Sequence, residues 1–503
     1  VLKVDGGGEV ADCAAIESGS PGFTMSDTDA VIRNSTASKV PTDADVAPTT
    51  AVVTVSEAFR RDVCNPEPLV HVARSGQTNS YFPGDDGAIQ AGVPWPSPRF
   101  VENGDGTITD LLTGLMWLKD GNCAGTVNYD PYPEDWPESE EMPWELTFDF
   151  VDGINDGTRD ISPCAGYTAT HTDWRVPNIH ELESLAHYGA SNPAAWLNGQ
   201  GFVNVEPSEY WSSTAFPVYG ERWIMDLNSG LLRTRQTKTS VLEFLWPVRG
   251  GAGPFPDPTY PVNIPRTGQT RSYQEGDDGD LQRGVAWPSP RFTDHGDGTV
   301  TDNLTGLMWL KDIGCLGNRK MELALEKIGL FNTNPADFDC TEYTADYGDW
   351  HLPNRREMHS VFGLAKTKTS AGSDALPDDH PFVNTDGNLW TSTVYAHNAP
   401  VLAWFYYIGT GSARTWQTQW GQYVWPVRGG LYAPPSRDVD VDRDGDVDGV
   451  DLGLLQAALG ANRDEGDTHF DERVDFLGDG VIDEADLAAF APHLGKTNCP
   501  CMP

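Results

Sequence analysis

An acidic segment near the end of the chain has the residue types and spacing of a calcium-binding loop. Ca²⁺ takes oxygen ligands, which a twelve-residue loop supplies from positions one, three, five, seven, nine and twelve, with glycine at position six for a sharp turn. Gly445 is the sixth residue of the segment that starts at Asp440, and Asp446 would bind through its backbone carbonyl. The sequence therefore predicts a Ca²⁺ site, and the alternative is a flexible acidic tail. The ligands of the Ca²⁺ site would be Asp440, Asp442, Asp444, Asp446, Asp448 and Asp451.

A second loop over residues 475–486 follows the same spacing less completely, because Leu477 stands at position three, where an oxygen is needed. We expect a weaker site, or one completed by water, with Asp475, Asp479, Val481, Asp483 and Asp486 as ligands. A short apolar helix is predicted after each loop, so this module is itself a duplication. With Asp rather than Glu at position twelve, the pattern resembles a type I dockerin, which implies a small α-helical, EF-hand-like module and a cohesin-like partner.

The cysteines favour disulfides rather than metal ligation, because none of the eight has the spacing of a zinc or CxxC motif. Cys123 and Cys164 lie in one half of an internal duplication, and Cys315 and Cys340 lie at the corresponding places in the other. By elimination Cys13 pairs with Cys64 and Cys499 with Cys501, unless these terminal cysteines cross-pair. Such a framework predicts an oxidising compartment, with the protein secreted, extracellular or attached to a cell surface.

The charge excludes two classes of partner. The formal net charge is −40, from 74 acidic against 34 basic residues, so the surface repels nucleic acid and anionic membranes and attracts cations. No run of about 18 apolar residues occurs, and we expect no membrane span.

The middle of the chain is duplicated. The segment GQTNSYFPGDDGAIQAGVPWPSPRFVENGDGTITDLLTGLMWLKD at 76–120 returns as GQTRSYQEGDDGDLQRGVAWPSPRFTDHGDGTVTDNLTGLMWLKD at 268–312, and both copies close on WPVRGG. Proline-rich stretches after each copy are predicted to be semi-rigid spacers rather than core. The expected organisation is an extended N-terminal segment 1–70 with a candidate strand at 50–59, a first domain 71–251, a linker 252–265, a second domain 266–430, a linker 431–437 and a calcium module 438–503.

Within each copy, short alternating runs bounded by Gly, Asp and Asn are typical of strands and turns. One helix is predicted over 179–187, and its counterpart over 355–362. The expected fold class is α+β and strand-rich.

Several motifs, in order, carry a family resemblance. The string GDGTxTDxxTGLMWxK, then DWRxPN before a helix, then WSST and WPVRGG, resembles the C-terminal domain of the Legionella collagen-like adhesin, once catalogued only as a domain of unknown function. The resemblance covers both copies. It implies two tandem domains with a fold like that of C-type lectins and the formylglycine-generating enzyme, used mostly for adhesion at cell surfaces.

Other candidate sites have plainer interpretations. His180 and His187 lie seven residues apart, which is not the spacing of a HExxH zinc helix, so we expect surface or capping histidines. The GDG segments that follow Asn103 and Asp294 could hold calcium, but plain hairpins are favoured. Most tryptophans recur in both copies and should be core. Trp416, which aligns with Arg235, and Trp420 break this symmetry and are candidates for a ligand face.

These patterns favour a non-enzymatic adhesion or extracellular-matrix protein with calcium-stabilised modules, whose ligand is a glycan or a protein at the cell surface. The second hypothesis is a structural subunit that self-associates into a filament by adding its N-terminal strand to a neighbouring molecule; an edge of its own first domain is the plainer partner for that strand. An oxidase or glycan-processing enzyme is the remote alternative, because the sequence offers no paired acid and base and no nucleophile.

Overall fold

A computed structural model describes residues 68–127, 142–216, 220–236, 243–257, 259–345, 347–364, 374–429 and 449–461, together with short strands in the first 54 residues and scattered positions between 471 and 490. The chain divides into two compact units. One contains residues 68–432 with both copies of the duplication, and the other contains the two ends of the chain.

The N-terminal segment contributes a four-stranded sheet in the order β1-β2-β3-β4, formed by Lys3–Asp5, Thr24–Ser26, Val31–Arg33 and Val52–Thr54. Strand β4 lies within the stretch predicted as a strand and pairs with β3, so its described partner lies inside the same N-terminal segment. This partner was not among those that the sequence suggested.

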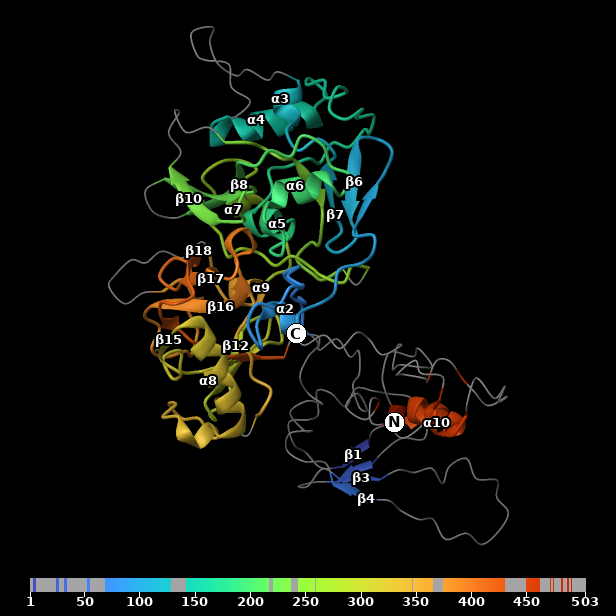
Figure 1. Ribbon diagram of the computed structural model, residues 1–503. Coiled ribbons are helices and arrows are strands. Elements are labelled where there is room, and N and C mark those ends of the chain that lie inside the picture. The colour runs from blue at the N-terminus through green and yellow to red at the C-terminus, as the bar shows by residue number, and fades with distance from the viewer. Residues whose placement is uncertain are drawn as a thin grey trace, which may run out of the picture. The chain divides into compact units, whose positions relative to one another are not determined.

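The two copies share most of their elements in the same order (Figure 1). The first contains α2 (Asp86–Ile89), β5 (Phe100–Glu102), β6 (Thr107–Asp110), β7 (Leu115–Leu118), α3 (Cys123–Thr126), α4 (Trp144–Asn155), α5 (Ile179–Ser184), α6 (Pro193–Asn198), β8 (Glu209–Phe216), β9 (Glu221–Asp226), β10 (Leu232–Gln236) and β11 (Val248–Gly250).

The second copy contains α7 (Asp278–Leu281), β12 (Phe292–Asp294), β13 (Thr299–Asp302), β14 (Met308–Leu310), β15 (Asn318–Arg319), α8 (Met321–Thr333), η3 (Pro335–Asp337), α9 (Arg355–Ser360), β16 (Asn388–Val394), η4 (Ala396–Asn398), β17 (Leu402–Tyr407), β18 (Ser412–Gln417), β19 (Gln422–Tyr423) and β20 (Val427–Arg428). Both copies are rich in strands and have few, mostly short helices, as predicted.

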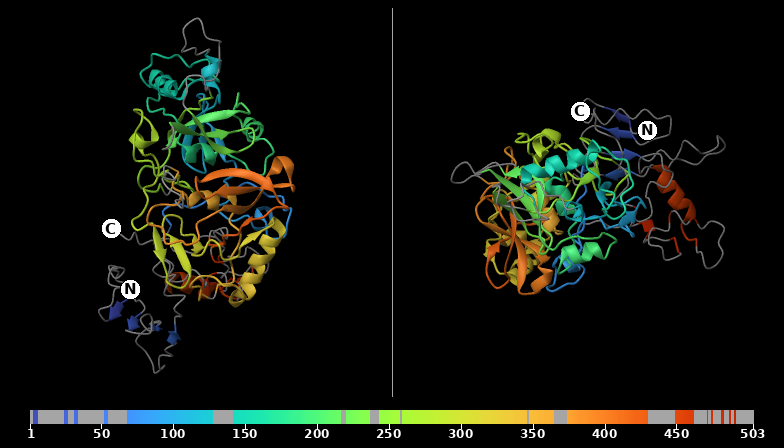
Figure 2. Two further views of the ribbon diagram at one scale, coloured as in Figure 1. Left: turned by 90° about the vertical axis from the view of Figure 1, so that its left-hand side faces the viewer. Right: turned by 90° about the horizontal axis from the view of Figure 1, so that it is seen from above.

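Each copy has a four-stranded sheet of its own, β11-β7-β6-β5 in the first and β12-β13-β14-β20 in the second. The remaining strands form one eight-stranded sheet in the order β15-β19-β16-β17-β18-β10-β9-β8. It passes from copy to copy where Leu232 of β10 pairs antiparallel with Ala413 of β18. The copies therefore lie side by side and share a sheet (Figure 2).

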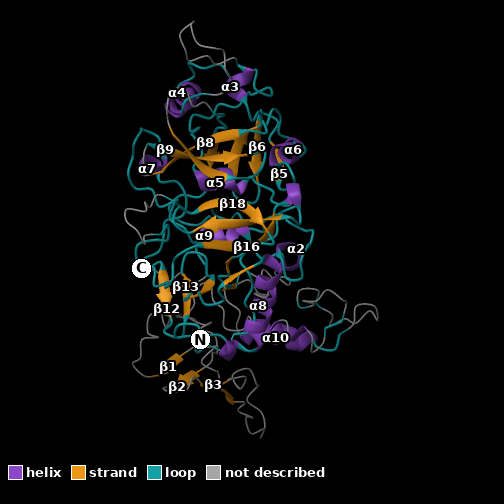
Figure 3. Cartoon of the chain, turned by 60° about the vertical axis from the view of Figure 1, so that its left-hand side comes forward, coloured by secondary structure: helices purple, strands orange, loops and turns teal. Residues whose placement is uncertain are grey.

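Two equivalent helices line the junction of the copies. Helix α5 packs on β8 and β9, and α9 packs on β16 and β17 (Figure 3). Each begins at an asparagine, Asn178 or Asn354, whose side chain accepts a hydrogen bond from the backbone N–H three residues on, while the glutamate at that position bonds back to the asparagine N–H. Such a capping box fixes where a helix starts, so the sequence predicted both starts correctly.

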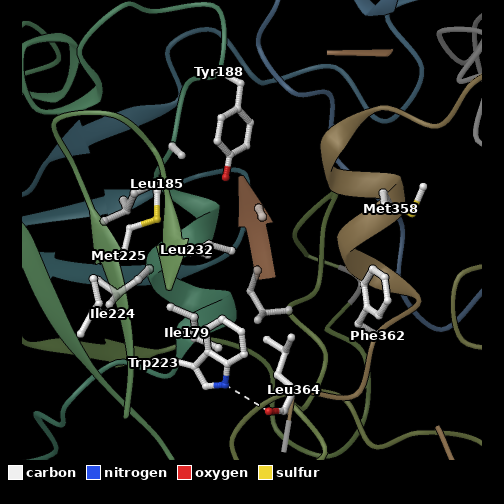
Figure 4. Close-up of a cluster of buried hydrophobic side chains, with 14 of the residues drawn as sticks. Ile179, Leu185, Tyr188, Trp223, Ile224, Met225, Leu232, Met358, Phe362 and Leu364 are labelled. Carbon is white, nitrogen blue, oxygen red and sulfur yellow. Dashed lines mark hydrogen bonds between the residues drawn. The ribbon is translucent and has the colours of Figure 1, made fainter. Parts of the chain in front are cut away.

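The hydrophobic core is continuous across the two copies. Trp223 of β9 donates its indole N–H to the carbonyl oxygen of Leu364 in the second copy at 3.0 Å (Figure 4). Ile179, Leu185 and Met225 of the first copy belong to the same cluster of buried side chains as Met358 and Phe362 of the second. The two copies therefore share one hydrophobic core.

The spacer between the copies differs from its prediction. Ala252, Val262 and Ile264 are buried, and the N–H of Val262 donates to the carbonyl of Leu112 at 3.0 Å. Phe255, in the same stretch, is 79% exposed. The proline-rich composition of this stretch gave no sign of its buried apolar residues.

The predicted bridges inside the copies are present. Cys123 is bonded to Cys164, and Cys315 to Cys340. Cys13, Cys64, Cys499 and Cys501 lie outside the described residues. No helix in the described part of the chain is long and apolar enough to cross a membrane.

Candidate functional site

The second copy presents two large aromatic side chains to solvent. Trp416 on β18 is 47% exposed and Trp420, just beyond the strand, is 58% exposed. Trp416 lies opposite Ala403 of β17, on the side of the ladder that also carries Phe405, whose ring is 6.3 Å from the indole in an edge-to-face arrangement. Trp420 donates its indole N–H to the side-chain oxygen of Gln417 at 2.8 Å. Each indole is thus contacted by a neighbour, while about half of the residue remains exposed to solvent.

In the first copy, ion pairs occupy the corresponding part of the sheet. Arg235, the counterpart of Trp416, bonds to Glu209 at 2.6 Å and lies 3.5 Å from Glu243, while Arg233 also pairs with Glu209. Partial burial lowers the pKa of Arg233, and the neighbouring guanidinium of Arg235 adds to that shift. The duplicated surface has therefore diverged, from ion-paired in one copy to aromatic in the other.

The GDG segments are hairpins, as predicted. Asp105 accepts hydrogen bonds from the N–H and hydroxyl of Thr107, which closes the turn between β5 and β6. Asp110, at the end of β6, is buried in an ion pair with Arg99 at 2.6 Å. Its charge is already matched, which argues against a metal role for this turn.

The family of the duplicated region follows from a comparison with family models. The model described as the Lcl C-terminal domain matches residues 106–249 and again 298–428, together more than half of the chain. The chain belongs to the Lcl C-terminal domain family. A search of curated proteins gives no match. Both Lcl matches begin inside the first hairpin, so the segments before Gly106 and Gly298 lie outside the family's pattern.

The predicted calcium loops fall mostly outside the described residues. Of the proposed ligands, Asp440, Asp442, Asp444, Asp446, Asp448, Asp475, Asp479 and Asp483 are not described, and Asp451 is described only as part of helix α10 (Gly449–Ala458). Val481 is partly buried and Asp486 fully buried. Within the described part of the chain, no cluster of three or more His, Cys, Asp or Glu side chains is arranged to hold a metal ion.

The described residues of this module do enclose a small core. Leu455 and Ala458 of α10 pack with Val474, Ile482 and Phe490. Gly460 donates its N–H to the carbonyl of Ile482 at 2.7 Å, and Ile482 donates back to Ala461 at 2.9 Å. The end of the first predicted repeat is thereby joined to the second loop, so this packing fits a paired module.

A second group of polar residues, which sequence reasoning missed, lies between the two Lcl domains. His180 was expected to be a surface or capping residue, and that prediction was wrong, because it is buried against His359 with ring centroids 4.9 Å apart. Its Nδ1 lies 3.1 Å from the carbonyl oxygen of Pro265 and donates to it. Burial lowers the pKa of both rings, that of His359 to about 3, so both imidazoles are neutral.

An ion pair lies beside the two histidines. Arg356 donates to Glu183 at 3.2 Å and to the backbone oxygens of Ser184 and Ala186. Burial alone would raise the pKa of Glu183, but Arg356 and other nearby cations lower it to about 2, so the carboxylate is ionised. In the alignment of the copies, His180 corresponds to Arg356 and Glu183 to His359. The histidine contact and the ion pair are therefore the same contact, made twice with different residues.

Proposed function

We propose that this chain is a secreted or cell-surface adhesion or matrix protein that acts by binding rather than by catalysis. The observation that carries the proposal is the pair of exposed tryptophans, Trp416 on strand β18 and Trp420 in the turn that follows it. Aromatic side chains offer a rigid apolar surface at low entropic cost, and sugar rings pack their C–H faces against such a surface. The expected ligand is a glycan, or a protein that carries one.

Two features support an extracellular site of action. The disulfides of the Lcl domains belong to an oxidising compartment, and the acidic composition suits a calcium-rich medium. In this proposal each Lcl domain has a C-type-lectin-like fold. The module 438–503 is dockerin-like and binds Ca²⁺, which would order its loops so that it docks to a cohesin-like partner.

The test is binding of the full chain to an array of polysaccharides and glycoproteins in the presence of Ca²⁺. Wild-type protein should bind a subset of glycans, and Trp416→Ala and Trp420→Ala should weaken that binding at least about tenfold, as expected for truncating a central aromatic anchor. Phe255→Ala is the matched control, since Phe255 is an exposed aromatic in the spacer. Equal binding by all four proteins would refute the role of the tryptophans.

A self-assembling structural subunit is the second candidate function. The contacts between the two Lcl domains favour this function. Each domain makes equivalent contacts with the other, so a domain of a second chain could make them too.

A further inference from the structure

Each copy begins with a segment that docks on the other copy. In the first copy this is residues 70–93, and in the second residues 262–285. We call these the straps. Gln77 of the first strap donates its amide to the carbonyl of Val394 at 2.8 Å and accepts from the N–H of Val394 at 3.0 Å. The Gln77 side chain thus makes a pair of hydrogen bonds with the backbone of the last residue of β16 in the other copy.

Two further bonds fix the tip of the first strap. Asp86 accepts a hydrogen bond from the hydroxyl of Thr393 at 2.6 Å, and the carbonyl of Ala91 accepts from the side chain of Asn354 at 3.0 Å. Gln77, Asp86, Thr393 and Asn354 are all buried. Asn354 is the residue that caps α9, so the strap is joined to the start of the helix that lines the junction.

The second strap makes equivalent contacts in the opposite direction, except that the Gln269 amide donates to the carbonyl of Arg271 in its own strap. Gln269 accepts from the N–H of Ala215 at 2.6 Å, Asp278 accepts from the hydroxyl of Thr214 at 2.8 Å, and the carbonyl of Arg283 accepts from Asn178 at 3.4 Å. Every partner is the aligned counterpart of one above. The junction is therefore isologous: residue i of copy 1 contacts residue j of copy 2, and the reverse also holds.

We propose that a second copy of this chain can enter this junction, so that copy 1 of one chain pairs with copy 2 of another and two chains close into an exchanged dimer. The contacts that the straps and the junction helices make between copies are retained in the exchange, while the spacer takes a new course and loses part of its own packing, such as that of Ala252 with Val70 and Val285. Exchange of identical elements is a low-cost route to dimers. Because the spacer holds the two copies of one chain at an effective concentration in the millimolar range, exchange is expected at chain concentrations that approach it, or on refolding at high concentration.

The ion pair at the junction selects which copies meet. Pairing copy 1 with copy 2 places Glu183 against Arg356 and His180 against His359, as within one chain. A junction of two second copies would place each Arg356 against a His359, the residue that aligns with Glu183. No carboxylate would then face the guanidinium. A buried guanidinium without its carboxylate is strongly destabilising. The exchanged dimer therefore keeps the pairing of unlike copies.

Single-cysteine chains test the exchange. A full chain with Asp86→Cys is mixed with a full chain with Thr393→Cys, concentrated to about the millimolar range, refolded together, diluted and oxidised. Within either chain the new cysteine faces the native residue, so a disulfide between these two positions forms only across chains. We expect a disulfide-linked dimer on non-reducing gels, and mass spectrometry should locate the bond between positions 86 and 393.

The control mixes Asp278→Cys with Thr393→Cys, which would join two second copies, and should give at least about tenfold less dimer because that pairing places Arg356 against His359 instead of Glu183. If Asp86→Cys does not fold, Asp278→Cys with Thr214→Cys tests the equivalent contact of the second strap. Absence of crosslink in both matched mixtures overturns the proposal. So does equal yield in the like-copy mixture, or a dimer seen by light scattering that lacks the crosslink. None of these results depends on glycan binding, so adhesion and exchange can fail separately.

Discussion

The two strap aspartates should make the stability of the tandem depend on pH. Asp86 and Asp278 are buried, and this desolvation raises the pKa of each carboxyl to about 7 from 3.8, although hydroxyl groups that donate to them act in the opposite direction. The carboxylates that face them add to the rise: Asp85 and Glu357 for the first, and Asp277 and Glu181 for the second.

The sign follows from which state binds more protons. A carboxyl with a raised pKa holds its proton in the folded protein at a pH where the unfolded chain has released it. The contribution of this proton to the free energy of unfolding has its full value below about pH 4. It decreases as the pH rises to about 7 and stays constant above that. Between pH 5 and pH 8 the loss amounts to two pH units, or about 3 kcal/mol for each aspartate.

The perturbation is the double variant Asp86→Asn and Asp278→Asn, which replaces each carboxyl by a neutral group of the same shape. The free energy of unfolding, measured by urea denaturation at pH 5, 6, 7 and 8, should fall less steeply for the variant than for the wild type. The difference between the two should change by about 6 kcal/mol over this range. Asp349→Asn, at an exposed ion pair with Arg428, is the control and should keep the wild-type profile. Parallel profiles for the double variant and the wild type would refute the burial of these carboxyls at the junction.

Three further outcomes are expected. Arg356→Ala should lower the free energy of unfolding by about 3 to 5 kcal/mol, because it leaves Glu183 buried and unpaired; Arg428→Ala at the surface should cost under about 1 kcal/mol, and equal losses would contradict the account. Replacing both Cys123 and Cys164 by Ser should cost about 2 to 5 kcal/mol, measured by urea denaturation against the wild type, and a loss below about 1 kcal/mol would contradict a stabilising bridge. Removing Ca²⁺ with a chelator should abolish hydrogen-exchange protection in Gly449–Ala458 while protection in 68–432 is retained, and unchanged protection in that helix would contradict calcium binding.

The features that the sequence predicted correctly depend on local signals or on comparison of the copies. Asn178 and Asn354 mark helix starts because a capping box is encoded within four residues. The pairing of Cys123 with Cys164 followed from the matching positions of two cysteines in each copy. Trp416 was singled out because its counterpart is Arg235, and a residue that diverges in polarity between two copies is free of the shared core.

What the sequence did not predict depends on contacts between distant residues. His180 is buried by His359, which lies in the other copy, and no local pattern at position 180 signals that neighbour. The straps left a usable signal, because Gln77 and Asp86 recur as Gln269 and Asp278 in a segment that the family's pattern does not include. Recurrent polar residues outside the shared motifs would have indicated a buried hydrogen-bonding role.

If reciprocal straps join the two Lcl domains into one cooperative body, differential scanning calorimetry of the full chain will show it. We expect residues 68–432 to unfold in one transition, with an enthalpy of about 250 kcal/mol near 60 °C and equal calorimetric and van't Hoff values. Two separate transitions of about half that enthalpy each, left unchanged by Asp86→Asn and Asp278→Asn, would contradict it.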